Sequence, residues 1–175
     1  FIQNDRRDLA IQALNRARQG EDPETMHASR AMGDLLFNAG RNETAARLYA
    51  DILAASPEDQ AVRLRLAETH LRLDQLDEAG EVLDDPSVQD SSTAKRGKAL
   101  IARQDNDLPT AMRLVNQLIA AEPERADLYL HRGSILARQE GRTQTAIEDL
   151  ERSLALNPDS TLARLTLANL LAESG

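Results

Sequence analysis

The stretch MHASRAMGDLLFNAGRNETAARLYADILAASPED, residues 26–59, decides the fold because its pattern recurs along the chain. An alanine recurs at spacings of 34, 32 and 35 residues, as Ala45, Ala79, Ala111 and Ala146. Five residues before each alanine stands a residue that tolerates a left-handed backbone, namely Gly40, Asp74, Asn106 and Gly141. The pattern predicts a repeated helical hairpin of about 34 residues, a period typical of solenoid proteins.

A second small residue precedes each of these alanines by 12 or 13 positions. The four are Gly33, Ala67, Ala99 and Gly133. A small residue on each helix of a hairpin lets the two backbones approach closely. We therefore expect the two helices of each hairpin to pack through these positions.

The unit at 26–59 resembles the tetratricopeptide repeat (TPR) family, with its small Gly33, turn Gly40, Ala45, aromatic Tyr49 and closing Pro57. The unit at 127–160 repeats the pattern with one extra residue near Glu140. The sequence departs from the family in having no Trp, and in placing Pro86 inside the second helix of its second unit. The resemblance implies an all-α fold, a right-handed TPR superhelix (α-solenoid) of antiparallel helix pairs.

The register divides the chain into one array of repeats. Complete repeats are expected at 26–59, 60–91, 92–125 and 126–160, with half-repeats at 1–22 and 161–175. Because a solenoid needs capping elements at its ends, we expect this chain to be a segment of a longer array. The expected helices cover 6–19, 24–39, 42–55, 58–73, 76–85, 91–104, 108–121, 124–140, 143–156 and 159–173.

Composition argues against several classes of function. The chain has no Cys, and its three His lie in different repeats without a second ligand at helical spacing, so no metal site is expected. No catalytic or nucleotide-binding motif occurs, so we expect no enzyme activity and no cofactor. A net charge of -8 argues against nucleic acid as a partner. No apolar run approaches the roughly 20 residues of a membrane span.

The resemblance also places a binding surface, because in TPR arrays the first helix of each pair lines the concave groove. The residues predicted to line a partner-binding groove are Arg30, Phe37, Leu64, Glu68, Leu71, Arg72, Arg96, Leu100, Arg103, Leu130 and Arg138. Arg beside exposed Leu is typical of protein interfaces, because guanidinium groups pair with carboxylates while Leu supplies apolar area. A solvated face with internal salt bridges is the alternative interpretation.

These features predict a protein–protein interaction scaffold. With 19 Arg, two Lys and no Cys, the chain resembles the periplasmic TPR regions of outer-membrane exopolysaccharide export proteins of the Pel, cellulose and alginate type, known from biofilm secretion. That resemblance implies docking of a periplasmic polysaccharide-modifying enzyme. The alternatives are the specificity arm of a transferase, a pilus-assembly factor and a cytoplasmic regulatory adaptor. Self-association through the half-repeat ends is a further expectation.

Overall fold

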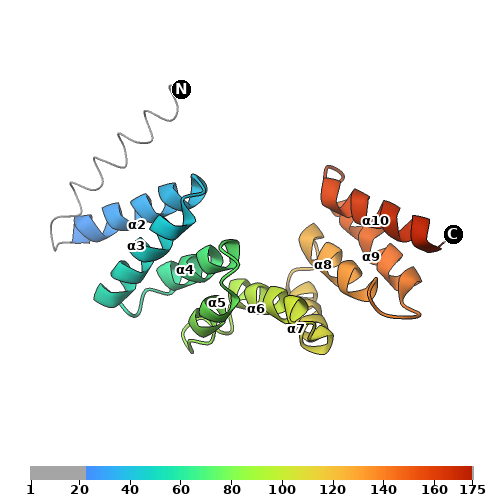
Figure 1. Ribbon diagram of the computed structural model, residues 1–175, viewed down its shortest axis with the longest axis horizontal. Helices are drawn as coiled ribbons and strands as arrows, with labels where there is room; N and C mark the ends of the chain where they lie inside the picture. The colour runs from blue at the N-terminus through green and yellow to red at the C-terminus, as the bar shows by residue number, and fades with distance from the viewer. Residues whose placement is uncertain (1–22, 175) are drawn as a thin grey trace, which may run out of the picture. The chain divides into compact units, whose positions relative to one another are not determined.

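The computed structural model describes residues 23–174, and these form nine α-helices and no strand (Figure 1). The helices are α2 (Pro23–Asn38), α3 (Asn42–Ala55), α4 (Gln60–Arg72), α5 (Leu76–Leu83), α6 (Ser92–Gln104), α7 (Leu108–Ala121), α8 (Ala126–Leu136), α9 (Thr143–Leu156) and α10 (Thr161–Ser174). The predicted all-α class is confirmed for this part of the chain. The helix expected at 6–19 and the whole half-repeat at 1–22 lie outside the described residues.

The residues predicted to turn the chain between paired helices do adopt the left-handed conformation. Their φ angles are 74° at Gly40, 59° at Asp74, 61° at Asn106 and 73° at Gly141. After α2, the Arg41 amide donates to the Leu36 carbonyl oxygen at 2.9 Å, the bond that closes a Schellman motif. The same spacing closes α4, where the Gln75 amide donates to His70 at 3.0 Å. Local backbone chemistry therefore sets where these hairpins turn.

Helix α8 ends earlier than the sequence predicted. The expected range of 124–140 was wrong at its C-terminal end, because α8 stops at Leu136. The Gln139 amide then donates to the Leu136 carbonyl oxygen at 2.9 Å, three residues back rather than four. These tighter turns accommodate the extra residue of this repeat before Gly141 reverses the chain.

The segment after α5 is a hydrogen-bonded turn with one buried residue. Asp85 Oδ1 accepts from the Ser87 amide at 2.9 Å, and the hydrogen bonds from Ser87 lower the pKa of Asp85. Asp85 also pairs with Arg63 of α4 at 3.1 Å, while Val88 is buried. Pro86 has no amide hydrogen to continue the helix and stands three residues after α5 ends.

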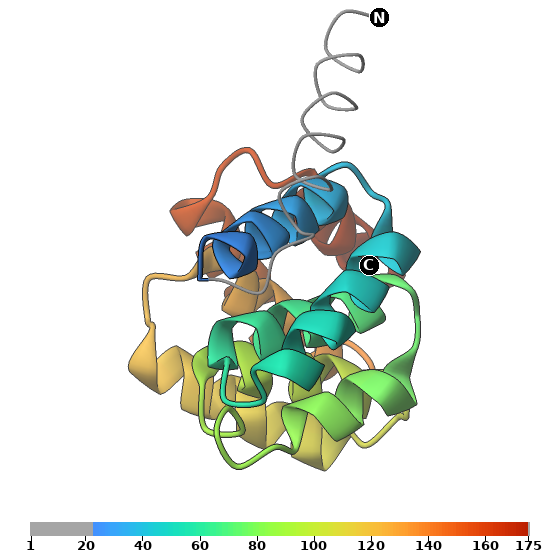
Figure 2. The same cartoon turned by 90° about the vertical axis from the view of Figure 1, so that its left-hand side faces the viewer.

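The described helices form two compact units, divided between Gly97 and Lys98 inside α6. In the first unit, α2 and α3 lie side by side as an antiparallel pair (Figures 1 and 2) and share a core with α4 around Leu36, Tyr49 and Leu66. In the second unit, one cluster forms around Ala111 and Ile135, and another joins α8, α9 and α10. The boundaries of the individual repeats stay a prediction.

The small residues of the repeat pattern lie where paired helices touch. Ala45, Ala79, Ala111 and Ala146 have no exposed surface. A Cβ atom on Gly33 would overlap the Tyr49 ring, whose Cζ atom would be 2.9 Å away. A Cβ atom on Gly133 would lie 3.0 Å from Leu150 Cγ and 3.1 Å from the Ala146 carbonyl oxygen. The expected packing of each pair through small residues is thus seen in both units.

Candidate protein-binding face

The eleven residues predicted to line a groove fall into two sets. Each set lies in one of the two units, and we call it the first-helix face of that unit. The set in the first unit is Arg30, Phe37, Leu64, Glu68, Leu71, Arg72 and Arg96. The set in the second unit is Leu100, Arg103, Leu130 and Arg138. Partner binding by either set stays a prediction, but the two sets differ in what their side chains contact.

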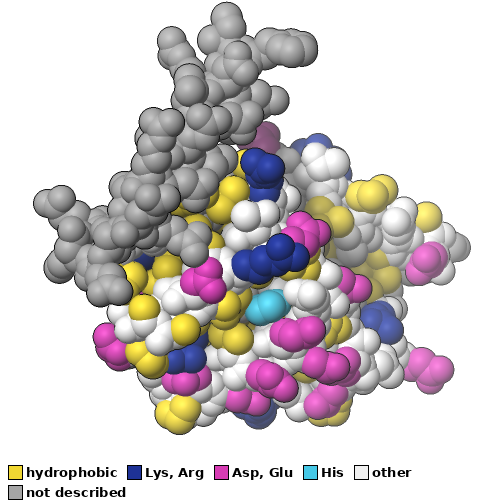
Figure 3. All heavy atoms as spheres, turned by 60° about the vertical axis from the view of Figure 1, so that its left-hand side comes forward, with side chains coloured by type: hydrophobic (Ala, Val, Ile, Leu, Met, Phe, Trp, Pro, Cys, Tyr) yellow, Lys and Arg dark blue, Asp and Glu magenta, His cyan; other side chains and the backbone are white. Residues whose placement is uncertain are grey.

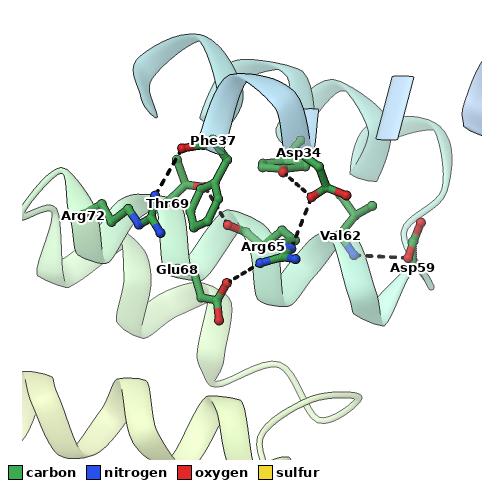
Figure 4. Close-up of polar contacts among 9 residues, drawn as sticks. Asp34, Phe37, Asp59, Val62, Arg65, Glu68, Thr69 and Arg72 are labelled. Atoms are coloured by element: carbon green, nitrogen blue, oxygen red, sulfur yellow. Dashed lines mark hydrogen bonds and ion pairs between the residues drawn. The ribbon is translucent and has the colours of Figure 1, made fainter. Parts of the chain in front are cut away.

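Phe37 and Arg72 bind each other. The guanidinium carbon of Arg72 lies 3.5 Å from the centroid of the Phe37 ring, and Arg72 Nη1 donates to the Phe37 carbonyl oxygen at 3.1 Å (Figure 4). A stacked cation and a satisfied carbonyl at the end of α2 both stabilise this contact. Phe37 is only 4% exposed, so its ring is part of the core and Arg72 is its outer cover.

Arg30 is tied to the start of α4. Its Nη2 atom lies 2.5 Å from Asp59 Oδ2, while Asp59 Oδ1 accepts from the Val62 amide at 3.2 Å. Asp59 is the N-cap residue of α4, where a carboxylate satisfies free amides and suits the helix dipole. The ion pair between Arg30 and Asp59 therefore holds α2 against the start of α4.

A polar network that the sequence did not reveal crosses the same face. Tyr49 Oη donates to Asp34 Oδ1 at 2.9 Å, and Arg65 Nε lies 3.2 Å from the same oxygen (Figure 4). Arg65 Nη1 also donates to Glu68 Oε2 at 3.0 Å. Burial and the hydrogen bond to Asp34 raise the pKa of the Tyr49 hydroxyl. Arg65 could have been found from its Glu68 partner, three residues further along the same helix.

The apolar members of the first unit's face are partly covered. Leu64 and Leu71 are half-buried, and Leu71 Cδ1 would lie 3.3 Å from a Cβ atom on Gly97. Arg96, at the end of this unit, is half-buried as well. The first-helix face of the first unit is thus largely occupied by contacts within the chain.

In the second unit the arginines at the same positions make fewer contacts within the chain: one has a single hydrogen bond and the other has none among the described residues. Arg103 lies in the last turn of α6, and its side chain has no ion pair or hydrogen bond with any residue that the structure describes. Arg138 is exposed and donates from Nη2 to Asn106 Oδ1 at 3.3 Å. Leu130 packs at the edge of the cluster that joins α8 to α10, and Leu100 is half-buried.

Helix α10 adds two residues that the sequence analysis missed. Leu162 is 63% exposed and Leu165 is 56% exposed. Leu165 precedes Gly175 by ten residues, as Leu64 precedes Asp74 and Arg96 precedes Asn106. The register that located the turns would therefore have placed Leu165 on the first-helix face. Two exposed leucines make this the most apolar part of either set.

A buried ion pair fixes α8 on α9 behind this face. Arg132 Nε and Nη2 each donate to a different oxygen of Asp149 at 2.7 Å, and Nη1 donates to Asn116 Oδ1 of α7 at 3.0 Å. The hydrogen bond to Asp149 raises the pKa of Arg132. The bidentate pair holds α8 in one orientation, so Leu130 projects from a rigid helix and Arg138 lies in the turn that follows it.

The described residues contain neither a cluster of metal ligands nor a membrane-spanning helix. Among residues 23–174, no three His, Asp or Glu side chains are grouped to hold a metal ion. No helix in this range is long and apolar enough to cross a membrane. What the surface does offer is charged and apolar side chains displayed on helices.

Two family models, both described as tetratricopeptide repeat, match residues 36–104 and 99–171. Together they span more than half of the chain, which belongs to the tetratricopeptide repeat family. Tetratricopeptide repeat protein 36 of Danio rerio is 34% identical over 87 residues, 47% of this chain and 46% of that protein. Protein O-mannosyl-transferase TMTC1 of Homo sapiens is 23% identical over 146 residues, 79% of this chain and 16% of that protein. The chain spans about half the length of the first of these relatives.

Solved structures show the same fold. MamA, residues 41 to the end, from Desulfovibrio magneticus RS-1 matches with a TM-score of 0.72 and 16% identity over 85% of each chain. YrrB, described as a TPR protein with an unusual peptide-binding site, matches with a TM-score of 0.72 and 19% identity over 94% of this chain and 84% of its own. The fold and the family together indicate a protein-interaction scaffold.

Proposed function

We propose that this chain holds a partner protein by docking an acidic, amphipathic segment against the first-helix face of its second unit. The observation that carries the proposal is the exposure of Leu162 and Leu165 on α10. Large apolar side chains of this kind, on the same unit as Arg103 and Arg138, match the composition of protein interfaces. The peptide-binding site named for YrrB supports the same kind of partner.

The chemistry of the two side-chain types defines the partner. Burying two leucines stabilises a complex through the hydrophobic effect, which needs apolar side chains on the partner. Arg103 and Arg138 are guanidinium groups that pair bidentately with carboxylates. The fitting segment therefore carries leucine-like residues on one side and Asp or Glu beside them.

The test uses a fluorescent helical peptide with leucine and glutamate at helical spacing, titrated against the whole chain by fluorescence polarisation. Leu165→Glu should weaken binding about tenfold, because it replaces apolar area with a repelling charge. Leu171→Glu is the matched control, since Leu171 lies on the same helix, is 49% exposed and projects about half a turn away from Leu162. Equal losses from the two variants, or no loss from either, would contradict the proposal.

Charge reversal tests the basic part of the face. Arg103→Glu combined with Arg138→Glu should weaken peptide binding and remove most of its salt dependence, because exposed charges are screened over about 8 to 10 Å. The free energy of unfolding should change by no more than about 1 kcal/mol, because exposed ion pairs contribute little. Unchanged peptide affinity in this double variant would count against a role for arginine.

The biological setting is a finer proposal. The Arg-rich, Cys-free composition supports a place in a bacterial exopolysaccharide secretion assembly, where this segment would dock a polysaccharide-modifying enzyme in the periplasm. The experiment is fractionation of cells that express the tagged full-length protein, followed by purification of its complex. A periplasmic protein that co-purifies with such an enzyme is expected. Recovery in the cytoplasm, without the enzyme, would overturn this setting.

A transferase arm is the second candidate function. The similarity to a protein O-mannosyl-transferase over 79% of this chain is the observation that favours it. Under this alternative, the full-length protein should transfer a sugar to a protein acceptor, and deleting residues 23–174 should change acceptor choice. A full-length protein that transfers no sugar would exclude it.

A further inference from the structure

A pocket opens on the first unit, away from the first-helix face. Its volume is about 310 Å³, and it lies between one side of α3 and the turn from α4 to α5. The lining residues are Glu43, Ala46, Arg47, Ala50, His70, Leu73 and Gln75. His70 follows Glu68 by two residues, which is about half a helical turn, so the pocket lies on the opposite side of α4 from Glu68.

One wall of the pocket is a side of α3 that carries Ala46, where α7 and α9 carry larger residues and α5 carries Gly80. Ala46 directly follows the recurring Ala45, and the equivalent positions in α7 and α9 are Met112 and Ile147. Both of these side chains pack against core clusters of the second unit. The space that a Met or Ile side chain would fill is left open beside Ala46.

The pocket has an apolar floor and a polar rim. Ala46, Ala50 and Leu73 supply the apolar part of the lining, with Ala46 buried and Ala50 exposed. On the rim, His70 Nδ1 lies 2.8 Å from Gln75 Oε1. Glu43 and Arg47 make no ion pair or hydrogen bond with any residue in the described range. An apolar floor with a few convergent polar groups is typical of binding sites.

The surface beside the pocket is strongly acidic. Residues 74–90 contain seven carboxylates and no Lys or Arg, and Asp77, Glu78 and Glu81 are exposed. Gln75, Glu78 and Val82 follow one side of α5, and Val82 packs against the core cluster that contains α3 residues. Glu78 therefore lies on the side of α5 that faces the pocket. Figure 3 shows acidic side chains gathered on this face of the molecule.

We propose that this outer pocket binds a basic peptide segment, which inserts one apolar side chain between Ala46 and Leu73 and directs lysine or arginine toward Glu43 and Glu78. The pocket is open to solvent, so it cannot enclose most of a small molecule as a ligand cavity does. A peptide needs only one side chain in the pocket, because its flanking residues bind Glu43 and the acidic surface of α5 beside the pocket. The acidic side chains outnumber Arg47 and set the charge of the partner.

This site is independent of the proposed docking on the second unit, and the probe has the opposite charge. We would titrate the whole chain with a fluorescent pentapeptide of one leucine between pairs of lysines. Replacing its leucine by alanine should weaken binding about tenfold, because the buried apolar area is lost. A peptide with glutamate in place of each lysine should not bind the pocket.

Two substitutions fill the pocket. Ala46→Met installs the side chain that α7 has at the equivalent position, and Ala50→Leu fills the space from an exposed position. Each should abolish the preference for leucine over alanine in the peptide. Because Ala50 is exposed, Ala50→Leu should leave the thermal unfolding midpoint unchanged even if Ala46→Met does not fold. Glu78→Gln should weaken binding and reduce its salt dependence.

Leu165→Glu is the matched control, because it alters the second unit alone. It should leave the affinity for the basic peptide unchanged. The inference is overturned by an absence of binding, by equal affinity for the leucine and alanine peptides, or by binding that survives Ala50→Leu. Loss on Leu165→Glu would place the basic peptide on the second unit and would overturn it as well. Failure of the acidic peptide to bind bears only on the proposed docking face.

Discussion

In the first unit, the side chains of the first-helix face mostly bind their own chain, whereas in the second unit several of them reach solvent. Arg30 pairs with Asp59, and Arg72 covers Phe37. In the second unit, Arg103 has no partner among the described residues, and Leu162 and Leu165 are exposed. At the same repeat positions, the side chains of the first unit are thus paired within the chain, whereas several side chains of the second unit are exposed and available to a partner.

The comparison teaches that position in a repeat does not determine availability. Arg30, Leu64, Arg96 and Leu165 stand at equivalent offsets from their turn residues, yet one is paired, two are half-buried and one is exposed. Availability depends on what the neighbouring helices supply. The α2 position is satisfied by the N-cap carboxylate of α4, whereas the described residues around α10 leave Leu165 exposed.

The largest expected effect contrasts the ion pairs of the two units. Arg132→Ala should destabilise the chain by about 3 kcal/mol, because it leaves the Asp149 carboxylate, 7% exposed, buried without its partner. Arg65→Ala removes an arginine from a pair whose side chains are nearly half exposed, and should cost no more than about 1 kcal/mol. Urea unfolding measures both. If the two substitutions lowered the free energy of unfolding equally, the burial of Asp149 would not explain a difference between the two ion pairs.

Overpacking is the next largest effect and tests the hairpin contact. Ala111 is fully buried between the helices of its pair, so Ala111→Leu should destabilise the chain by roughly 1 to 3 kcal/mol. Ala120→Leu on the same helix is the control, because Ala120 is exposed and should be nearly neutral. Ala45→Leu should behave like Ala111→Leu in the first unit. Unchanged thermal unfolding in either buried variant would contradict the repeat register.

The backbone turns and close helix contacts could be predicted from sequence because they depend on local properties. Gly40 and Asn106 turn the chain where their tolerance of positive φ allows it, and Gly33 lies against Tyr49 because no Cβ atom fits there. The end of α8 was placed wrongly because one extra residue can be absorbed either by a longer helix or by a tighter turn. Only the hydrogen bonds distinguish these two solutions.

The candidate face was harder to predict because pairing between helices depends on side-chain geometry. Arg65 and Asp34 are 31 residues apart, and nothing in their spacing distinguishes a pair from two solvated charges. The sequence analysis left a face with internal salt bridges as an alternative, and the first unit has that character. The pattern did contain Leu165, since the offset from Gly175 was available, but the expected groove stopped at α8.

A smaller effect contrasts one exposed arginine from each unit. Arg72→Ala should destabilise the chain by about 1 kcal/mol, because it removes the stack on Phe37 and the hydrogen bond to its carbonyl oxygen. Arg138→Ala should be nearly neutral, because its contact is a 3.3 Å hydrogen bond to Asn106 at the surface. Arg72→Lys keeps the charge but not the planar stack and should fall between the two. If Arg72→Ala left the free energy of unfolding unchanged, the stacking of Arg72 on Phe37 would not contribute to stability.

The smallest expected effect is the pH dependence that Asp107, the N-cap residue of α7, contributes to the stability of the chain. Asp107 caps α7 by accepting from the Thr110 amide at 3.1 Å, and the hydrogen bonds from Thr110 lower the pKa of Asp107. A lowered pKa in the folded state means that the stabilisation is present above the unfolded pKa of about 4 and is lost as the pH falls through the folded value. Asp107→Asn keeps an acceptor oxygen but cannot ionise.

The free energy of unfolding of the parent chain should therefore fall more steeply than that of Asp107→Asn as the pH is lowered below about 4, and the two curves should run parallel near neutral pH. Asp59→Asn in the first unit should differ from this pattern. It removes the ion pair with Arg30, so its loss of stability should already be present at neutral pH. Urea titrations at a series of pH values measure all three proteins. The prediction for Asp107 fails if the curves for Asp107→Asn and the parent stay parallel below pH 4. The prediction for Asp59 fails if Asp59→Asn is as stable as the parent at neutral pH.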